Sequence, residues 1–280
     1  MSGRTPGNLH PAHRPRLPSA VTTEESQPIS PKRPRKKDRP PRNKRPDLNG
    51  LLVIDKPLKM SSAHVCTIIR GKTAGAKVGH AGTLDPLATG VLVICLGKAT
   101  KLVERIMGTP KRYLTEIDLS AFSTTEDLEG ELTPMDVAQA DRPTLETIQQ
   151  AIAEKFTGVI SQAPPSFSAI KIGGKPAYKL ARAGEIPSEL EPRNIRIDSI
   201  DVVDYTWPKL TLDIRCGRGT YIRSIARDLG RAIGTGGHLT ALRRTAVGQF
   251  TADMAQQLES IPEDDQMNES ALLPMDDLQD

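Results

Sequence analysis

One aspartate, Asp85, lies in a loop of small and turn-forming residues, GHAGTLDPLATG at positions 79–90. The three glycines of this stretch allow tight turns and the close approach of a ligand. Pro86 disfavours helical backbone at Asp85 and stiffens the loop, so the carboxylate is presented in a fixed position. Such a group could act as a nucleophile or stabilise a positive charge during a reaction. An aspartate in a Gly/Pro loop is more often a turn residue, so the loop by itself leaves both interpretations open.

Two short motifs, GKT at 71–73 and GKAT at 97–100, suggest a phosphate-binding loop. A P-loop needs a further glycine five residues before the one that precedes the lysine, but Cys66 and Leu92 occupy those positions. No G-x-G-x-x-G motif follows an expected strand. We therefore expect no nucleotide cofactor.

The three cysteines, Cys66, Cys95 and Cys216, are odd in number, widely spaced and flanked by aliphatic residues. We expect small buried side chains rather than zinc ligands or disulfides, hence no metal and a reducing, cytoplasmic compartment. The longest apolar run, Val91 to Leu96, is far too short to span a bilayer, and no signal-peptide pattern follows Met1, so we expect no membrane association.

Charge divides the chain into three parts. Residues 1–46 hold 12 Lys or Arg against 3 acidic residues, whereas residues 251–280 hold 9 acidic residues and no Lys or Arg. Ten prolines and few apolar residues predict a disordered basic arm over 1–47, which could tether nucleic acid or merely keep the protein in solution. A catalytic domain over 48–250 and an acidic C-terminal tail over 251–280 complete the expected organisation.

Between these ends, short strand and helix patterns are interspersed without a regular βαβ alternation. This favours an α+β fold with a mixed, largely antiparallel sheet and flanking helices. An apolar stripe of Ile222, Ile225, Leu229 and Ile233 predicts an amphipathic helix. Strands are further expected at 50–56, 90–97, 111–119, 194–207 and 209–217, and helices at 62–72, 98–108 and 145–157.

The stretch GHAGTLDPLATGVLVICLGKATKL resembles, nearly residue for residue, the catalytic motif of the TruB family of tRNA pseudouridine synthases. GLLVIDKPLKMSS precedes it, and KRYLTEIDL, PPSFSAIKIGGKPAYKLARAG, CGRGTYIRSIARDLG and GGHLTALRRTAVGQF follow in the family's order, covering about 200 of the 280 residues. The resemblance implies the pseudouridine synthase fold and isomerisation of uridine 55 in the T-loop of tRNA. The base would be flipped out, leave C1′ and rejoin through C5, with no cofactor. It also implies tRNA, bound through its T-arm, as the partner of a monomer.

The resemblance also implies roles for single residues. Asp85 matches the essential catalytic carboxylate, and Arg223 matches the arginine that pairs with it and can hold it through two hydrogen bonds. Tyr113 resembles the tyrosine that stacks on the flipped base, a contact that contributes about 1–3 kcal/mol. Tyr221 resembles a second tyrosine near the base edge, where a phenol could assist proton removal at C5.

Other matched positions are expected to bind the substrate. His80 resembles the histidine that takes up the space left by the flipped base, Lys56 would support the loop or a phosphate, and Leu242 would pack on the uracil face. Gly82 allows close approach. Basic residues suited to contacts with the tRNA backbone are Lys111, Arg112, Arg243 and Arg244.

The chain departs from the family pattern in three places. Phe167 stands where the family often has a tyrosine, which removes one hydroxyl group. In SAFSTTEDLEG, Ser120, Ser123 and Thr124 replace a glycine, a threonine and an aspartate, from which we expect local loop changes rather than loss of the site. Bacterial relatives continue into a PUA-type RNA-binding domain, whereas only 30 residues follow Phe250 here, so we expect no full domain of this kind.

Three alternatives compete with this interpretation. The protein could bind or remodel RNA without catalysis, although pure binding does not need a poised carboxylate. It could be a guide-dependent synthase of the dyskerin kind, although such proteins carry a PUA domain. It could be a glycosyl hydrolase that uses Asp85, but that reaction needs a second carboxylate, and none is matched nearby.

Overall fold

The structure is a computed structural model that describes residues 47–168, 170–185, 190–263 and 272–275. The expected basic arm lies outside the described residues except for Asp47, and so does most of the acidic stretch after residue 263. The domain boundaries given above therefore stay predictions.

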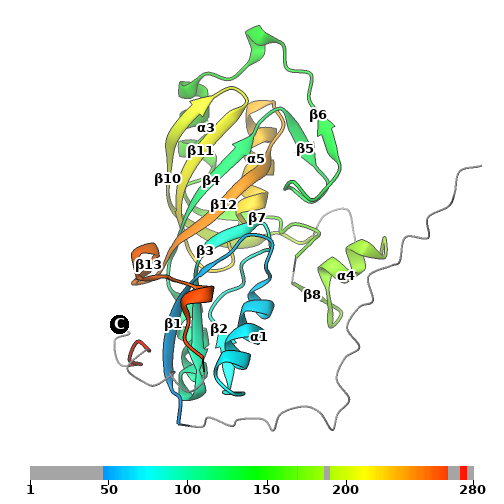
Figure 1. Cartoon of the computed structure of the whole chain (residues 1–280). Helices are drawn as coiled ribbons and strands as arrows, with labels where there is room; N and C mark the ends of the chain where they lie inside the picture. The colour runs from blue at the N-terminus through cyan, green and yellow to red at the C-terminus, as the bar shows by residue number, and fades with distance from the viewer. Residues whose placement is uncertain (1–46, 169, 186–189, 264–271, 276–280) are drawn as a thin grey trace, which may run out of the picture. The chain divides into compact units, whose positions relative to one another are not determined.

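A mixed sheet of ten strands organises the described chain (Figure 1). Its strands are β1 (Gly50–Lys56), β2 (Val78–His80), β3 (Ala88–Leu96), β4 (Lys111–Asp118), β7 (Gly158–Gln162), β10 (Arg193–Thr206), β11 (Lys209–Cys216), β12 (His238–Val247), β13 (Phe250–Thr251) and β14 (Gln256–Gln257). The order is β14-β1-β3-β12-β4-β11-β10-β7, with β2 on β3 and β13 on β12. Only the β1–β14 and β3–β12 pairs are parallel. The predicted α+β fold with a mixed, largely antiparallel sheet is confirmed.

Two small hairpins and five α-helices complete the described elements. The hairpins are β5–β6 (Ala121–Ser123, Leu132–Pro134) and β8–β9 (Lys171–Ile172, Lys175–Pro176). The helices are α1 (Ser62–Lys72), α2 (Val103–Gly108), α3 (Leu145–Lys155), α4 (Ala177–Arg182) and α5 (Ile222–Ile233), with 3-10 turns η2 (Gly97–Leu102), η3 (Gln139–Asp141), η4 (Ala252–Met254) and η5 (Leu258–Ser260). Within the described residues, no helix has the length and apolar character needed to cross a bilayer.

The strongest local signals in the sequence set the helix ends. The Ser61 side chain accepts a hydrogen bond from the backbone N–H of His64 and caps α1, and Thr144 caps α3 in the same way through Thr147. Helix α5 ends at Gly234, whose φ of 76° is the left-handed conformation that glycine adopts without strain. The starts of α1 and α3 agree with the sequence analysis.

Two expected helices differ in detail, and one central strand was not expected. Residues 98–108 form 3-10 helix η2 followed by α2 rather than one helix. Helix α3 ends at Lys155 because strand β7 starts at Gly158. Strand β12 lies between β3 and β4, but its polar residues obscured the strand pattern in the sequence.

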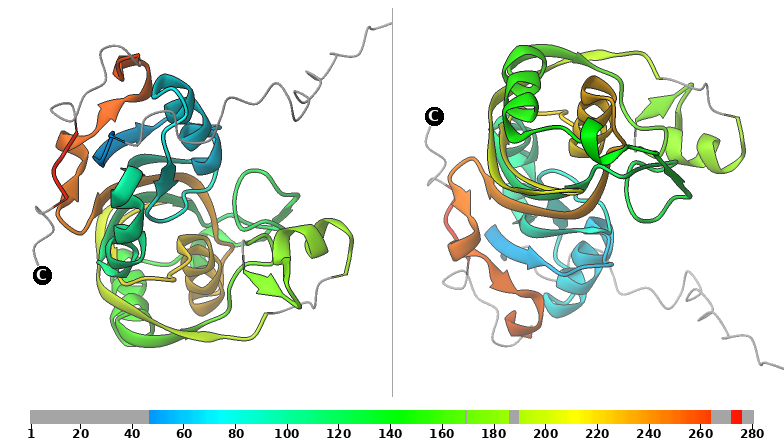
Figure 2. Two further views of the ribbon diagram at one scale, coloured as in Figure 1. Left: turned by 90° about the horizontal axis from the view of Figure 1, so that it is seen from below. Right: turned by 90° about the horizontal axis from the view of Figure 1, so that it is seen from above.

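The core lies on both faces of the sheet. Strand β3 is buried on each side, because Leu92, Ile94 and Leu96 pack into one cluster while Val91 and Val93 pack into another. The larger cluster includes the apolar stripes of α1, α3 and α5. Helices α3 and α5 contact each other and lie within the curve of the sheet (Figure 2). The sheet and the larger helices thus form a rigid frame around the loops described below.

Part of the segment after residue 250 also belongs to the core. Strand β14 pairs with the outer edge of β1, and Leu258, Ile261 and Leu272 are buried in the larger cluster. Leu51 and Leu273 exchange two backbone hydrogen bonds of 3.0 and 2.8 Å. These residues, expected to form a weakly patterned tail, cover the edge of the first strand.

One glycine offers a test of this packing. Gly90 has a φ of +97°, and a Cβ atom there would lie 2.2 Å from the carbonyl oxygen of Arg244 on β12. We expect Gly90→Ala to lower the free energy of unfolding by about 3 kcal/mol, from backbone strain and steric overlap. Chemical denaturation measures this change. As a control, Gly71→Ala on the exposed face of α1, with no neighbouring atom within 4 Å, should be neutral or stabilise by about 0.5–1 kcal/mol. Equal effects of the two substitutions would contradict the prediction.

Candidate active site

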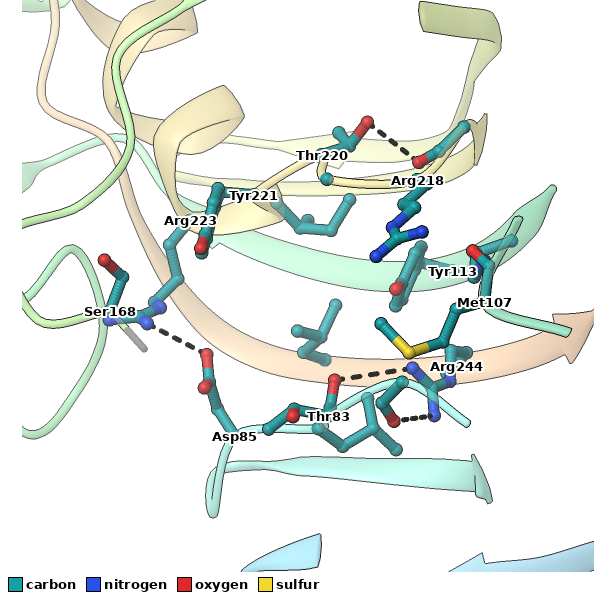
Figure 3. Close-up of a pocket in the computed structure, with 17 residues that line it drawn as sticks. Thr83, Asp85, Met107, Tyr113, Ser168, Arg218, Thr220, Tyr221, Arg223 and Arg244 are labelled. Carbon is teal, nitrogen blue, oxygen red and sulfur yellow. Dashed lines mark hydrogen bonds and ion pairs between the residues drawn. The ribbon is translucent and has the colours of Figure 1, made fainter. Parts of the chain in front are cut away.

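A pocket lies where the loop between β2 and β3, strands β4 and β12, and the start of α5 meet (Figure 3). We call the loop, residues 81–87, the Asp85 loop. The pocket brings together all four predicted catalytic residues, Asp85, Tyr113, Tyr221 and Arg223, although they are spread over about 140 residues of sequence. Four of the predicted binding residues line it as well: Gly82, Lys111, Leu242 and Arg244.

Buried side chains hold the backbone of the Asp85 loop. The Ser62 hydroxyl, at the start of α1, accepts a hydrogen bond from the N–H of Leu84 (2.8 Å) and donates one to its carbonyl oxygen (3.0 Å). The backbone N–H of Lys59 donates to the carbonyl of Pro86 (2.8 Å), and the N–H of Ala88 donates to that of Asp85 (3.0 Å). The loop is therefore fixed on both sides of Asp85 without use of the Asp85 carboxylate.

Lys56 supports the same loop from below. Its side chain is fully buried, and its Nζ donates to the carbonyl oxygens of Pro57 (2.9 Å) and Met60 (2.7 Å) and approaches that of Pro86 (3.5 Å). Burial lowers the pKa of Lys56 to about 8, while the negative charge of Asp85 acts in the opposite direction. Of the two roles expected for this residue, the geometry favours support of the loop over contact with a phosphate.

Arg244 differs from its expected role as an exposed contact for the tRNA backbone. It is only 1% exposed, and its guanidinium donates to the carbonyl oxygens of Val91 (2.8 Å), Gly82 (3.1 Å) and Thr83 (3.5 Å). The parallel pairing of β12 with β3 places it directly behind the Asp85 loop. Because its donors are used by these carbonyls, Arg244 fixes the first half of the loop and contributes positive charge to the pocket wall.

Asp85 and Arg223 form the ion pair expected from the sequence. Nη2 of Arg223 lies 3.0 Å from Oδ2 of Asp85. The two side chains differ sharply in exposure, since the arginine is 6% exposed and the aspartate 38%. The charge of Arg223 is thus fixed inside the protein, and the carboxylate of Asp85 faces the pocket.

Three further oxygens hold the Arg223 guanidinium. Nη1 donates to the carbonyl oxygen of Thr125 (3.0 Å) and lies 3.5 Å from the Asp127 carboxylate, both in the β5–β6 turn (124–131). Nη2 donates to the carbonyl oxygen of Phe167 (2.9 Å). One buried arginine therefore joins helix α5, the β5–β6 turn, the segment 163–168 and the Asp85 loop. The altered sequence of the turn keeps Asp127 in place, consistent with the local change expected there.

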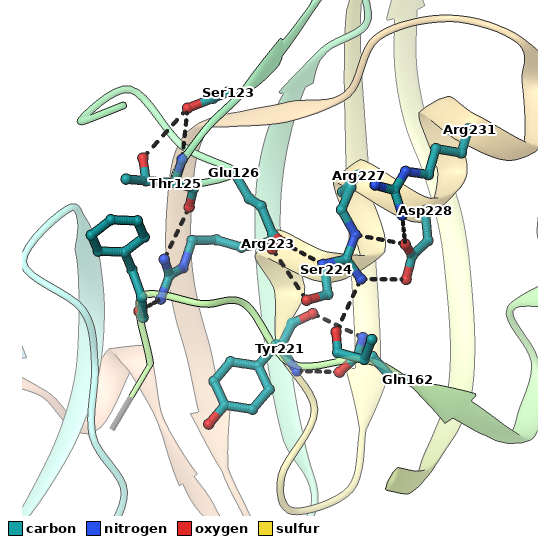
Figure 4. A network of polar contacts seen from close by, with 12 residues as sticks. Ser123, Thr125, Glu126, Gln162, Tyr221, Arg223, Ser224, Arg227, Asp228 and Arg231 are labelled. Atoms are coloured by element: carbon teal, nitrogen blue, oxygen red, sulfur yellow. Dashed lines mark hydrogen bonds and ion pairs between the residues drawn. The ribbon is translucent and has the colours of Figure 1, made fainter. Parts of the chain in front are cut away.

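The two predicted tyrosines face the pocket from different elements. Tyr113 lies on β4, and Tyr221 lies at the start of α5, where its backbone is held by the Gln162 amide through hydrogen bonds of 2.8 and 3.0 Å (Figures 3 and 4). Burial raises the pKa of both phenols. At neutral pH each ring is therefore a neutral surface with a hydroxyl group.

A second layer of charged residues lies behind Arg223 (Figure 4). Glu126, buried and at a φ of 64°, accepts hydrogen bonds from Ser224 (3.1 Å) and from Arg227. Arg227 also donates to the carbonyl of Ala163 (3.0 Å). Burial raises the pKa of Glu126, and the charges of Arg227 and Arg223 act against this rise. The Glu126–Arg227 pair therefore fastens to α5 the two backbone segments that hold Arg223.

Of the other predicted binding residues, His80, Arg112 and Arg243 are not among the residues that line the pocket, whereas Lys111 lines it. His80 ends β2 just before the loop; burial lowers its pKa, and its Nδ1 has no hydrogen-bond partner among the described residues. Arg112 and Arg243 form two-bond ion pairs with Asp213 and Asp55. Lys111 is buried, with its Nζ on the carbonyls of Met107 and Thr109, and burial lowers its pKa to about 8. Their contacts with RNA stay predictions.

Several residues of the site were not predicted from the sequence. Gln162 and Ser168 belong to the SQAPPSFSA stretch, whose two buried prolines and polar residues were a usable signal. Ser62 stands at the expected start of a helix, and nothing in its local sequence indicates its contact with Leu84. The charged residues of the second layer, Glu126 and Arg227, carry no local signal, because their partners lie about 100 residues away.

Comparison with known proteins identifies the family. The model described as "TruB family pseudouridylate synthase (N terminal domain)" matches residues 70–222, more than half of the chain. The chain belongs to the TruB family of pseudouridylate synthases. The model described as "tRNA pseudouridylate synthase B C-terminal domain" matches residues 223–279, which include α5 and β12.

Similar proteins agree with this membership. The chain is 43% identical to tRNA pseudouridine synthase B of Cupriavidus taiwanensis over 245 residues, covering 86% of this chain and 76% of the relative. It is 46% identical to the Mycobacterium tuberculosis protein of the same name over 218 residues, covering 76% and 72%.

Among solved structures, a chain of a Cbf5-Nop10-Gar1 complex has a TM-score of 0.58 at 28% identity, covering 75% of this chain and 52% of that one. A chain of an H/ACA RNP bound to a substrate RNA containing 2′-deoxyuridine has a TM-score of 0.59 at 24% identity, covering 81% and 59%, and supports the fold alone. This chain thus spans between half and three fifths of the length of these two structures.

The second layer gives a prediction about stability. Glu126→Ala would leave Arg227, which is 13% exposed, with only the more exposed Asp228 as carboxylate partner, so we expect the free energy of unfolding to fall by about 2 kcal/mol. The control is Asp198→Ala, which breaks the exposed Arg196–Asp198 pair and should change stability by less than about 1 kcal/mol. Chemical denaturation of both variants measures the difference. Similar small changes would show that the buried pair does not fasten the site.

Proposed function

We propose that this protein converts uridine 55 in the T-loop of tRNA to pseudouridine, with Asp85 as the catalytic group. The Asp85–Arg223 pair at 3.0 Å is the single observation that carries the proposal, because it presents a fixed carboxylate to a pocket with two tyrosines in a member of a pseudouridylate synthase family. Homologues named tRNA pseudouridine synthase B support tRNA as the substrate.

The pocket suits a flipped nucleotide. A base inside an RNA stem-loop cannot reach Asp85, so the target uridine must be extruded, at a cost of a few kcal/mol. The Tyr113 ring, Leu242 and Ile222 offer surfaces against which the uracil can pack, and stacking returns about 1–3 kcal/mol. The free energy gained by packing the uracil in this pocket thus offsets the cost of flipping it out of the RNA.

The reaction exchanges one bond of the uracil for another. The C1′–N1 bond breaks, the base turns, and a C1′–C5 bond forms while the C5 proton is lost and N1 gains a proton, so that the product is an isomer. Asp85 can bond to the sugar as a nucleophile or stabilise its positive charge, and either role needs the carboxylate in a fixed position. Arg223 provides that position, and Tyr221, which lines the same pocket, could assist removal of the C5 proton through its hydroxyl.

Binding of RNA without catalysis is the second candidate. The pocket wall carries the positive groups Lys111, Arg218 and Arg244, which suit a nucleic acid with or without a reaction. The fixed Asp85–Arg223 pair favours catalysis, since a carboxylate facing the pocket would repel a phosphate backbone.

Tritium release tests the proposed reaction. With unmodified tRNA labelled at C5 of uridine, we expect the wild-type protein to release tritium, and a transcript with cytidine at position 55 to release none from that position. Asp85→Asn keeps the shape of the side chain and removes its charge, so we expect release to fall at least about 1,000-fold. Wild-type protein that binds tRNA but releases nothing would favour the second candidate.

The basic arm gives a prediction about affinity. Residues 1–46 lie outside the described structure, but their charge suits a tether for the phosphate backbone. Deletion of this arm should weaken tRNA binding and flatten the dependence of log Kd on log salt, by about 0.7–0.9 for each phosphate that the arm neutralises. A shuffled arm of the same composition should restore both, and a Gly/Ser segment of equal length should restore neither. Equal affinity of the intact and deleted proteins at two salt concentrations would exclude the tether.

A further inference from the structure

One polar side chain of the pocket has no use in the site as described so far. Ser168 is 4% exposed and lines the pocket, yet its Oγ lies within hydrogen-bond geometry of no described residue. The Tyr221 hydroxyl is near enough for Ser168 to act against the burial-driven rise of the tyrosine pKa. A buried hydroxyl without a well-formed hydrogen bond costs about 1–3 kcal/mol, so it needs an explanation in a native protein, and a partner supplied by the substrate is one. The Ser168 hydroxyl therefore points to a contact made by the substrate.

Its neighbours place this hydroxyl beside the catalytic pair. The preceding residue, Phe167, gives its carbonyl to Nη2 of Arg223, the same nitrogen that holds Asp85. The Ser168 carbonyl accepts the N–H of Tyr178 at the start of α4 (3.0 Å), which fixes the backbone on the other side. The serine thus stands on a held stretch of backbone rather than on a free loop.

The pocket has two different ends (Figure 3). Asp85, Arg223 and Ser168 lie at one end, and Tyr113, Met107 and Arg218 lie at the other. A uridine that places C1′ at Asp85 extends its uracil ring toward Tyr113. Its C2′ atom, bonded to C1′, remains at the first end together with the 2′-hydroxyl. In this pose Ser168, at the same end of the pocket as Asp85, lies nearer to the sugar than to the base.

We propose that Ser168 hydrogen-bonds the 2′-hydroxyl of the target nucleotide, and so makes the pocket selective for ribose. A serine hydroxyl and a 2′-hydroxyl can each donate and accept, so the pair can satisfy both groups. The contact also restrains the sugar next to the bond that breaks. This inference rests on the proposed function, because it takes Asp85 to act at C1′.

A thermodynamic cycle tests the contact directly. The four measurements use full-length protein with Asp85→Asn, which leaves the substrate unconverted, with or without Ser168→Ala, and tRNA with uridine or 2′-deoxyuridine at position 55. With Ser168 present, the loss of the 2′-hydroxyl should weaken binding about threefold to tenfold, the usual range for one hydrogen bond. With Ser168→Ala, the two tRNAs should bind within about twofold of each other. The same ratio in both proteins, including a ratio of one, overturns the proposal.

Activity supplies an independent measurement. Ser168→Ala, in protein with Asp85 intact, should lower kcat/KM for tritium release about tenfold, while thermal unfolding stays close to that of the wild type because no well-formed hydrogen bond of the hydroxyl is lost. The matched control, Ser161→Ala at an exposed position of β7, should leave kcat/KM unchanged. Wild-type protein without tritium release would defeat the proposed function. An active wild type with an additive cycle would defeat only the role of Ser168.

Discussion

The burial of one guanidinium organises the catalytic region. Arg223 is almost completely shielded from water, so its donors need oxygens from the protein, and the four oxygens come from three loops that are far apart in sequence. A buried charge without such partners is strongly unfavourable. The Arg223 guanidinium therefore has all its partners only when the three loops and helix α5 adopt the arrangement that also places Asp85 in the pocket. Because the buried Arg223 guanidinium must be hydrogen-bonded by protein oxygens, the positions of those oxygens are fixed, and the geometry of the site is fixed with them.

The Asp85 loop is held in place by hydrogen bonds between its backbone and buried side chains. Its carbonyl and N–H groups meet Ser62, Lys56 and Arg244, which come from three different elements and are all nearly fully buried. Backbone groups carry these contacts, so the only side chain that must remain available is the aspartate itself. Preorganisation of this kind reduces the rearrangement needed when charge develops on the substrate. The rigid sheet below, with β3 buried on both faces, prevents the supporting residues from shifting.

The parts of the fold that the sequence predicts are those with local causes. The caps Ser61 and Thr144 and the continuous apolar runs of β1 and β3 are each decided within a few residues. The long motif around Asp85 indicated the catalytic residues because it matches a family, whereas the loop alone left its role open. The buried place of Arg244 could not be predicted, because two adjacent arginines in a strand give no sign of which one points inward. The roles of Glu126 and Gln162 could not be predicted either, because they depend on contacts with segments that are distant in sequence. The role of Ser168 depends on the lack of a well-formed hydrogen bond, which the sequence does not reveal.

The pairing of β14 with β1 has a consequence for biosynthesis. Ile54 and its partner Gln256 are separated by about 200 residues, so the outer edge of the first strand emerges from the ribosome long before the residues that cover it. An uncovered strand edge is a template for pairing with other chains, and slow closure of such an edge favours aggregation during synthesis. During synthesis the edge of β1 therefore stays uncovered until Gln256, Gln257 and Leu273, about 200 residues later in the sequence, can pair with it. Yield in the cell should accordingly be more sensitive than catalysis to changes in these few residues.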